Sequence, residues 1–485
     1  MNLNPLLEPL WVNAILPEIV LSVAGMALIM LEAMFPKIRD GLAPLTVIAL
    51  IATLFAETMV AAGSFFGGSY EISQITQIFD FAFILAALLV TMLSREYLNR
   101  EQLEGAEYYA LILWGTVGMM MMGKGLDLLV VILGLEMLSI CIFALLGYHR
   151  RIPVSNESSL KYFLMGAFAT GFILYGTALF YGATGTTRIP DLANHISTSG
   201  VASPMITIGF VLLMAGVGFK LALAPFHGWA PDVYQGAPTP VAAWLSVAPK
   251  AATLLALIRI ISVLLPVETL LPSTTIIAAL SVLSMVIGNF VAIAQRDLKR
   301  MLAYSGIAHV GYMMIAMMSV SRDDAVAAIS VYAITYAFMN IGAFGVISLL
   351  DKNQNDPQTL HDIAGLGFRR PFYGLALGLF MFSLAGIPPT AGFVSKFYIF
   401  KVAIESGHLR IALIGILTSI VSVYYYLRVV YYLYMKEGDA QSPELATGIF
   451  SVGALVIACV GILVIGIYPT PLFRTALNAA QNLLR

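Results

Sequence analysis

The chain has 485 residues, of which 59% are hydrophobic and only 11% are charged. A soluble globular protein has roughly 45–50% apolar and about 25% charged residues, so this composition excludes a soluble enzyme. The net charge of −1 gives no basis for binding nucleic acid. Cys141 and Cys459 lie in apolar runs and provide neither a disulfide framework nor a metal or iron–sulfur ligand set. We therefore expect an all-α polytopic protein of the lipid bilayer.

Apolar stretches separated by polar breaks predict about fourteen transmembrane helices. The predicted spans are 13–35, 43–62, 78–94, 108–123, 127–148, 159–182, 205–224, 241–264, 275–294, 302–320, 325–350, 372–402, 409–434 and 447–469. Loops after odd-numbered spans contain 13 lysines and arginines, whereas loops after even-numbered spans contain 5, among them Lys124. The positive-inside rule places the odd-numbered loops in the cytoplasm and both chain termini on the opposite side.

The seventh and twelfth spans are interrupted by proline. The seventh reaches Pro225 and continues into HGWAPDVYQGAPTP, and the twelfth contains Gly-Ile-Pro-Pro at 386–389. Proline removes an amide donor, and unwound backbone at membrane depth persists only inside protein or beside a wet cavity. Paired interrupted helices in two halves of a chain indicate an internal repeat with a site near the midplane. Two ordinary proline kinks are the alternative interpretation.

Several charged side chains fall inside or at the edges of the predicted spans. The basic ones are Lys161, Lys220, Lys250, Arg259, Lys396 and Arg428. A charge at the bilayer centre costs at least ~2.5–3.5 kcal/mol, so a set of charges requires a reason. Glu136 lies nine residues past Asp127, which is roughly 13 Å along a helix and therefore mid-membrane.

Lysine and glutamate are residue types that can gain and lose protons in a protein, whereas arginine stays charged. Glu136, Lys220, Lys250 and Lys396 therefore predict a proton path through the membrane. A permanent ion pair between Glu136 and Lys220 is the structural alternative. His309, in the segment AYSGIAHVGYMM, has the side chain that best suits a proton relay.

The spacing of these residues predicts a repeat. Positions 136, 220 and 250 are followed by polar residues at 309, 396 and 428, at offsets of 173, 176 and 178. We therefore expect four parts. They are the N-terminal helices in 1–107, a first five-helix repeat in 108–264, a second in 275–434, and a C-terminal helix in 447–485.

Other features of the sequence are less informative. Glu18, Glu32 and Glu57 have no evident partner, and the tyrosines in 424–426 and 431–434 are interpreted as interface anchors. Rossmann glycines, a P-loop and a haem motif are all missing from the sequence. We therefore expect no redox cofactor in this chain.

Three segments resemble the antiporter-like membrane subunits of respiratory complex I, and among these paralogues the N type of bacteria. They are KLALAPFHGWAPDVYQGAPTPV at 220–241, GNFVAIAQRDLKRMLAYSGIAHVGYMM at 288–314 and FSLAGIPPTAGFVSKFYIF at 382–400. The resemblance extends over essentially the whole chain. The block PDVYQGAPTP followed by Lys396 is fairly specific for the N type, because the M type generally has glutamate at this lysine.

The resemblance implies fourteen helices with two inverted five-helix repeats, in which helices 7 and 12 are broken. It also implies a role for each candidate site residue. Glu136 would pair with Lys220 and modulate it, Lys250 would be the central lysine, Lys396 the outlet lysine, and His309 an accessory relay.

The same resemblance implies a non-redox subunit of a proton-translocating NADH:quinone oxidoreductase in the bacterial inner membrane, with both termini periplasmic. NADH, FMN, iron–sulfur clusters and quinone would be bound by other subunits. The expected partners are paralogous antiporter-like subunits, a small K-type subunit and the lateral helix of an L-type subunit. A subunit of an Mrp-type cation/proton antiporter is the alternative, and a non-pumping structural subunit is a third interpretation. The identity of the quinone, the electron donor and any contribution of Na⁺ stay open.

Overall fold

The computed structural model describes residues 9–199, 203–264, 273–350, 358–438, 445 and 447–481. The N-terminal part comprises α1 (Pro9–Ala14), α2 (Leu16–Met34), η2 (Pro36–Ile38), α3 (Arg39–Met59), β1 (Gly63–Phe65), η3 (Phe66–Gly68), β2 (Tyr70–Ile72) and α4 (Gln74–Glu101). It is followed by α5 (Ala106–Lys124), α6 (Leu128–Leu146), α7 (Pro153–Thr184), α8 (Ile189–Ser199), α9 (Pro204–Leu221), α10 (Ala230–Gly236) and α11 (Thr239–Leu264). The remaining helices are α12 (Ser273–Ala294), α13 (Leu298–Met317), α14 (Asp323–Ser348), α15 (Leu366–Arg369), α16 (Pro371–Ala385), α17 (Ala391–Glu405), α18 (Leu409–Met435), α19 (Ile449–Ile467) and α20 (Thr470–Gln481).

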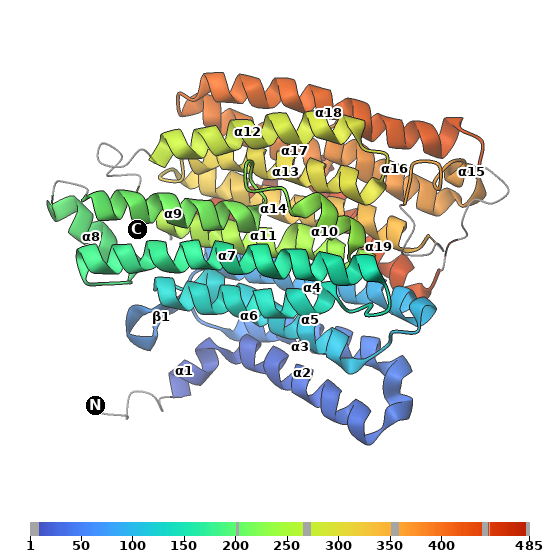
Figure 1. Ribbon diagram of the computed structural model, residues 1–485, viewed down its shortest axis with the longest axis horizontal. Helices are drawn as coiled ribbons and strands as arrows, with labels where there is room; N and C mark the ends of the chain where they lie inside the picture. Colours follow the sequence, from blue (N-terminus) through green and yellow to red (C-terminus); the bar gives the residue numbers. More distant parts are fainter. Residues whose placement is uncertain are drawn as a thin grey trace.

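The molecule is a bundle of long helices that run side by side, from α2 at one edge to α18 at the other (Figure 1). In the described part of the chain, 11 helices are long and apolar enough to cross a membrane. Shorter or more polar helices, α5, α13 and the pair α16–α17, overlap the remaining predicted spans. The prediction of an all-α polytopic fold is therefore confirmed. The helices α8 and α20 were not predicted, because neither has a long apolar run.

The two ends of the bundle differ. One end of the bundle carries α1, α8 and the hairpin of β1 and β2 (Figure 1). The other end carries α15. Lys37 and Arg39 lie at the end opposite the hairpin, because α3 begins at Arg39 and the hairpin follows its other end. Helices α11 and α14 form the centre, where almost no side chain reaches the surface.

The seventh predicted span is broken, as the prolines indicated. Helix α9 ends at Leu221, where Ala222 adopts a left-handed φ of 56°, and α10 starts eight residues later. The backbone freed by the break is satisfied by other groups, as when the amide of Ala224 donates to Ser284 Oγ at 2.9 Å. An ordinary proline kink would keep the helix continuous, so that alternative is wrong here.

The twelfth predicted span is broken in the same way. Helix α16 ends at Ala385, Gly386 follows with a φ of 84°, and α17 begins at Ala391. The amide of Gly392, in the first turn of α17, donates to Ser383 Oγ at 3.1 Å. The two half-helices are thus joined by a side-chain hydrogen bond across the break.

Replacing Gly392 by alanine is expected to destabilise this break by about 3 kcal/mol, because a Cβ there would lie 1.8 Å from the carbonyl oxygen of Ser383. The measurement is the midpoint of thermal unfolding of the purified protein in detergent. Gly171→Ala on α7 is the control, since a Cβ at that position meets nothing within 4 Å. Equal midpoints for the two variants would contradict the prediction.

Helices α5 and α6 touch through their backbones. A Cβ added to Gly118 would lie 2.6 Å from the carbonyl oxygen of Gly134, and the reverse distance is also 2.6 Å. Glycine at both positions is therefore required for this close approach.

The same helix pairs pack in both predicted repeats. Helix α5 packs on α6 as α12 packs on α13, and α7 packs on α9 as α14 packs on α16. These pairings support two five-helix units, although the inverted relation and the boundaries 108–264 and 275–434 stay predictions.

Candidate proton-transfer site

Lys220 lies in the last turn of α9, directly before the first break. Its Nζ atom donates to Ser139 Oγ at 2.7 Å, and the side chain is buried. A cation is favourable here because the C-terminal end of a helix carries partial negative charge. The position of Lys220 at an irregular backbone agrees with the sequence-based prediction.

Glu136 lies one turn before Ser139 on α6 and is half-buried. Its Oε1 atom accepts a hydrogen bond from Thr170 Oγ1 at 2.7 Å. The described residues include no direct ion pair between Glu136 and Lys220. The permanent ion pair that was the structural alternative is therefore not formed in this structure, and Ser139 is the direct partner of Lys220.

Lys250 lies in the middle of α11 and is 2% exposed. Among the described residues, its Nζ atom has no hydrogen-bond partner. A Cβ at Gly306 of α13 would lie 3.2 Å from this Nζ and 2.8 Å from Tyr336 Oη, so glycine makes room for both polar groups. Lys250 is thus a buried amine without an ion-pair partner in the described part of the chain.

His309 lies on α13 one turn after Gly306 and is completely enclosed. Its Nδ1 and Nε2 atoms contact Tyr332 Oη at 2.8 Å and Tyr426 Oη at 3.0 Å, and Tyr426 in turn hydrogen-bonds to Ser305. The imidazole therefore has a hydroxyl partner on each nitrogen, which is the arrangement that a proton relay requires.

The His309 ring lies 4.9 Å from the ring of Tyr336, whose hydroxyl adjoins Gly306 together with Lys250 Nζ. It lies 5.9 Å from the ring of Tyr312, which Lys396 faces. The fold thus brings together three residues from α11, α13 and α17 that are far apart in the sequence. Lys220, Lys250, His309 and Lys396 are called the buried series below.

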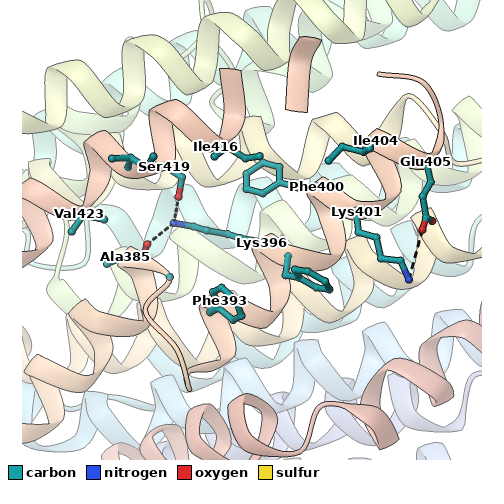
Figure 2. A pocket seen from close by; sticks show the side chains of 13 residues that line it. Ala385, Phe393, Lys396, Phe400, Lys401, Ile404, Glu405, Ile416, Ser419 and Val423 are labelled. Atoms are coloured by element: carbon teal, nitrogen blue, oxygen red, sulfur yellow. Dashed lines mark hydrogen bonds and ion pairs between the residues drawn. The ribbon is translucent and has the colours of Figure 1, made fainter. Parts of the chain in front are cut away.

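Lys396 follows the second break. Its Nζ atom donates to the carbonyl oxygens of Leu384 and Ala385 at 3.0 and 3.1 Å, and to Ser419 Oγ at 2.9 Å. Figure 2 shows Lys396 reaching toward Ala385 and Ser419, whereas Lys401 pairs with Glu405 further along α17. The ammonium group therefore caps the C-terminal end of α16.

The side chain of Lys396 also lines a cavity of about 600 Å³ between α17 and α18 (Figure 2). The remaining lining is mostly apolar, and Phe393, Phe400 and Ile416 contribute to it. Lys396 is thus the member of the buried series that lies beside open space.

Each lysine of the buried series faces a tyrosine ring. The distances from Nζ to the ring centroid are 5.8 Å for Lys220 and Tyr162, 5.8 Å for Lys250 and Tyr234, and 5.4 Å for Lys396 and Tyr312. A desolvated cation gains about 2 kcal/mol from such a ring, which partly offsets the cost of burial. Sequence analysis missed these rings, because they come from other helices and no local pattern connects them to the lysines.

Two of the predicted interface tyrosines have a different role. Tyr425 and Tyr426 are completely buried, and Tyr425 Oη donates to Asn289 Oδ1 at 3.0 Å. Tyr424 is 59% exposed and fits the prediction. Arg428, which the repeat spacing matched to Lys250, donates instead to backbone carbonyl oxygens of residues 293 and 295 at the end of α12.

Glu18, Glu32 and Glu57, for which the sequence shows no partner, each have an ion-pair partner in the structure. Glu32 accepts from Arg39 at 2.7 Å and from the amide of Ala106 at 2.7 Å. Glu18 and Glu57 both contact Lys124, which was assigned to a loop but is fully buried at the end of α5. These pairs join distant parts of the chain, so sequence spacing carries no signal for them.

Among the described residues, no cluster of histidine, cysteine, aspartate or glutamate side chains could hold a metal ion.

Comparisons with known proteins identify the family of this chain. The family described as "NADH:quinone oxidoreductase/Mrp antiporter, TM" matches residues 125–422. NADH-quinone oxidoreductase subunit N of Trichlorobacter lovleyi is 43% identical over 484 residues, covering 99% of each chain. A chain of respiratory complex I from Thermus thermophilus with bound aureothin is 34% identical with a TM-score of 0.82, covering 94% of this chain and 98% of that one.

A chain of the Mrp complex from Dietzia is 18% identical, with a TM-score of 0.80 and coverage of 100% and 98%, so that likeness shows the fold alone. The family match and the full-length relatives together decide the assignment. The chain belongs to the NADH:quinone oxidoreductase/Mrp antiporter family, and within it to the N subunits of NADH-quinone oxidoreductase.

Proposed function

We propose that this chain is a proton-translocating, non-redox membrane subunit of an NADH:quinone oxidoreductase. The observation that supports the proposal is the buried series, in which Lys250, His309 and Lys396 come from three different helices. The rings of Tyr336 and Tyr312 lie between them. A structural subunit without transport would gain nothing from buried titratable groups, since apolar residues of similar volume are often equally stable or more stable.

Coupling starts at Lys220. Quinone reduction in other subunits changes the charge or hydration beside this chain. Glu136 responds to this change, because it is only half-buried and its Oε1 atom accepts from Thr170 of α7. A shift of the Glu136 carboxylate changes how strongly it holds the Lys220 ammonium, which hydrogen-bonds only to Ser139 in the described residues. Lys220 then releases its proton toward Lys250, past the aromatic side chains of Tyr162 and Tyr234.

Lys250 passes the charge to Lys396, with His309 and its tyrosine partners as the relay. Lys396 is the outlet, because it lines the cavity between α17 and α18. Moving one charge against 100 mV costs about 2.3 kcal/mol, which a change of about two pKa units can supply.

The other parts of the enzyme belong to partner subunits. NADH, FMN, iron–sulfur clusters and quinone are bound there, and this chain contacts paralogous antiporter-like subunits, a small K-type subunit and the lateral helix of an L-type subunit. The excess of loop cations at odd-numbered turns supports an orientation in the bacterial inner membrane with both termini periplasmic.

Copurification tests this function. The chain is tagged in its native host, the membranes are solubilised gently, and NADH:quinone reductase activity and iron–sulfur signals are measured in the eluate. We expect both to copurify with the tagged chain and to be sensitive to a quinone-site inhibitor. A tagged paralogue of the same membranes is the control for recovery of the intact complex.

Recovery with hydrophobic antiporter-like subunits but no redox activity would replace the proposal with an Mrp-type antiporter, whose fold is the same. Sodium-dependent proton exchange in vesicles would then be the decisive assay.

A further inference from the structure

Four charged side chains from four different helices meet near the hairpin end of the bundle. Lys124 Nζ lies 2.8 Å from Glu18 Oε1, 3.5 Å from Glu57 Oε2 and 2.7 Å from Asp80 Oδ2. These residues come from α5, α2, α3 and α4, and their side chains are between 0% and 8% exposed. We call them the Lys124 cluster.

The groups around the cluster do not balance its charge. Tyr70 of β2 donates to Glu18 Oε1 at 2.6 Å and is neutral. Arg259 of α11 is the next cation, but it already forms an ion pair with Glu71 at 3.1 Å. Even with this second pair included, four carboxyl groups face two cations, so complete ionisation would leave two uncompensated negative charges in a buried site.

A buried site cannot retain such an excess, because isolated charges removed from water neutralise by binding protons. The individual oxygen atoms point to the same conclusion. Glu18 Oε2, Glu57 Oε1 and Asp80 Oδ1 are buried and have no donor among the described residues. Asp80 is completely enclosed and directed into the cluster, so its free oxygen is an acceptor without a hydrogen.

Glu57 and Asp80 share the Lys124 ammonium group as a partner, at 3.5 and 2.7 Å, so their carboxyl groups are close neighbours. Two carboxylates both lack a hydrogen to donate, so a hydrogen bond between them requires a proton on one of the two. A proton on one of these two neighbouring carboxyl groups would remove the repulsion between them.

A metal cation is a poorer occupant than a proton. The Lys124 ammonium already lies among the three carboxylates, at the place where a cation would gain most from them. The described residues include no group suited to a metal ion. The excess negative charge is thus best neutralised by a proton bound to a carboxyl oxygen.

We propose that the Lys124 cluster is a second proton-binding site, which holds at least one exchangeable proton between Glu57 and Asp80 at the hairpin end of the bundle. It is separate from the buried series: on α11, Arg259 beside the cluster lies nine residues beyond Lys250, which is roughly 13 Å along the helix. The proposal goes beyond the function proposed above, because proton binding by the cluster does not require transfer through the lysines.

Infrared difference spectroscopy on the whole complex tests the proposal. A pH titration of the wild-type complex, with aspartate carrying ¹³C in its carboxyl group, should show a carboxylic-acid C=O band that shifts with the label or with deuteration. Asp80→Asn and Glu57→Gln should each lose or displace this band. Glu405→Gln is the matched control, because Glu405 is an exposed ion-pair partner on α17, and it should leave the band unchanged.

Lys124→Met is a second variant with a different expected result. Removing the only cation among three carboxyl groups should increase the intensity of the carboxylic-acid band, since one more proton is needed for neutrality. If the variants do not assemble, the isotope shift of the carboxylic-acid band in the wild-type complex still tests the proposal.

Three results would overturn the proposal: no carboxylic-acid band in the wild-type complex, a band unchanged in both Asp80→Asn and Glu57→Gln, or loss of the band when Na⁺ is added at fixed pH. The last result would make the cluster a sodium site. None of these results bears on whether the chain copurifies with reductase activity, so the two proposals fail separately.

Discussion

Lys250→Met is expected to stop proton transfer through this chain while leaving the fold intact. Lys250 Nζ has no hydrogen-bond partner among the described residues, so its removal leaves no partner unsatisfied. Methionine has a similar length and no charge, and burying it costs less than burying an ammonium group. Carrying a proton through hydrocarbon without an ammonium costs at least ~2.5 kcal/mol, so proton-coupled activity should fall at least about tenfold.

The measurement is the number of protons pumped per NADH oxidised in sealed vesicles, together with the amount of assembled complex. Lys401→Met is the control, since Lys401 is a half-exposed lysine paired with Glu405 on α17. Wild-type pumping by an assembled Lys250→Met complex would remove Lys250 from the path.

His309→Phe is expected to reduce proton pumping strongly as well. Phenylalanine preserves the ring but removes both nitrogens, and with them the contacts to Tyr332 and Tyr426. Acid–base groups in such positions typically contribute at least about 100-fold, so pumping should fall strongly even with Lys250 and Lys396 in place. The readout is again protons pumped per NADH oxidised.

His309→Gln separates transfer from packing, because glutamine keeps one donor and one acceptor near the tyrosines but does not titrate. If His309 only positions its neighbours, His309→Gln should restore pumping, and the relay is disproved. His361→Phe is the control, since His361 is exposed and its ring packs against that of Tyr432 in a T-shaped contact that phenylalanine can also make.

The helices of this protein could be predicted from the sequence because apolar length and proline placement are local properties. The breaks after Leu221 and Ala385 lie within the segments where the prolines indicated them. The lysines beside those breaks could be recognised as well, because a charge within an apolar run is visible without knowledge of its neighbours.

The partners of those charges could not be predicted, because they depend on packing between distant helices. Glu18 and Lys124 are separated by 106 positions, and Ser305 and Tyr426 by 121. No period in the sequence connects such pairs. A glutamate such as Glu57 could therefore be recognised as unusual, but its role in the Lys124 cluster follows only from the packing of α2, α3, α4 and α5.

The backbone contact between Gly118 and Gly134 gives α5 and α6 a mechanical property. No side-chain layer separates the two helices there, so a change of rotamer cannot accommodate a relative displacement. We therefore expect α5 and α6 to move as one rigid unit. Glu136 lies two residues beyond Gly134 on one helix, and Lys124 lies at the end of the other. A displacement of α6 by a neighbouring subunit would thus move Glu136 and Lys124 together.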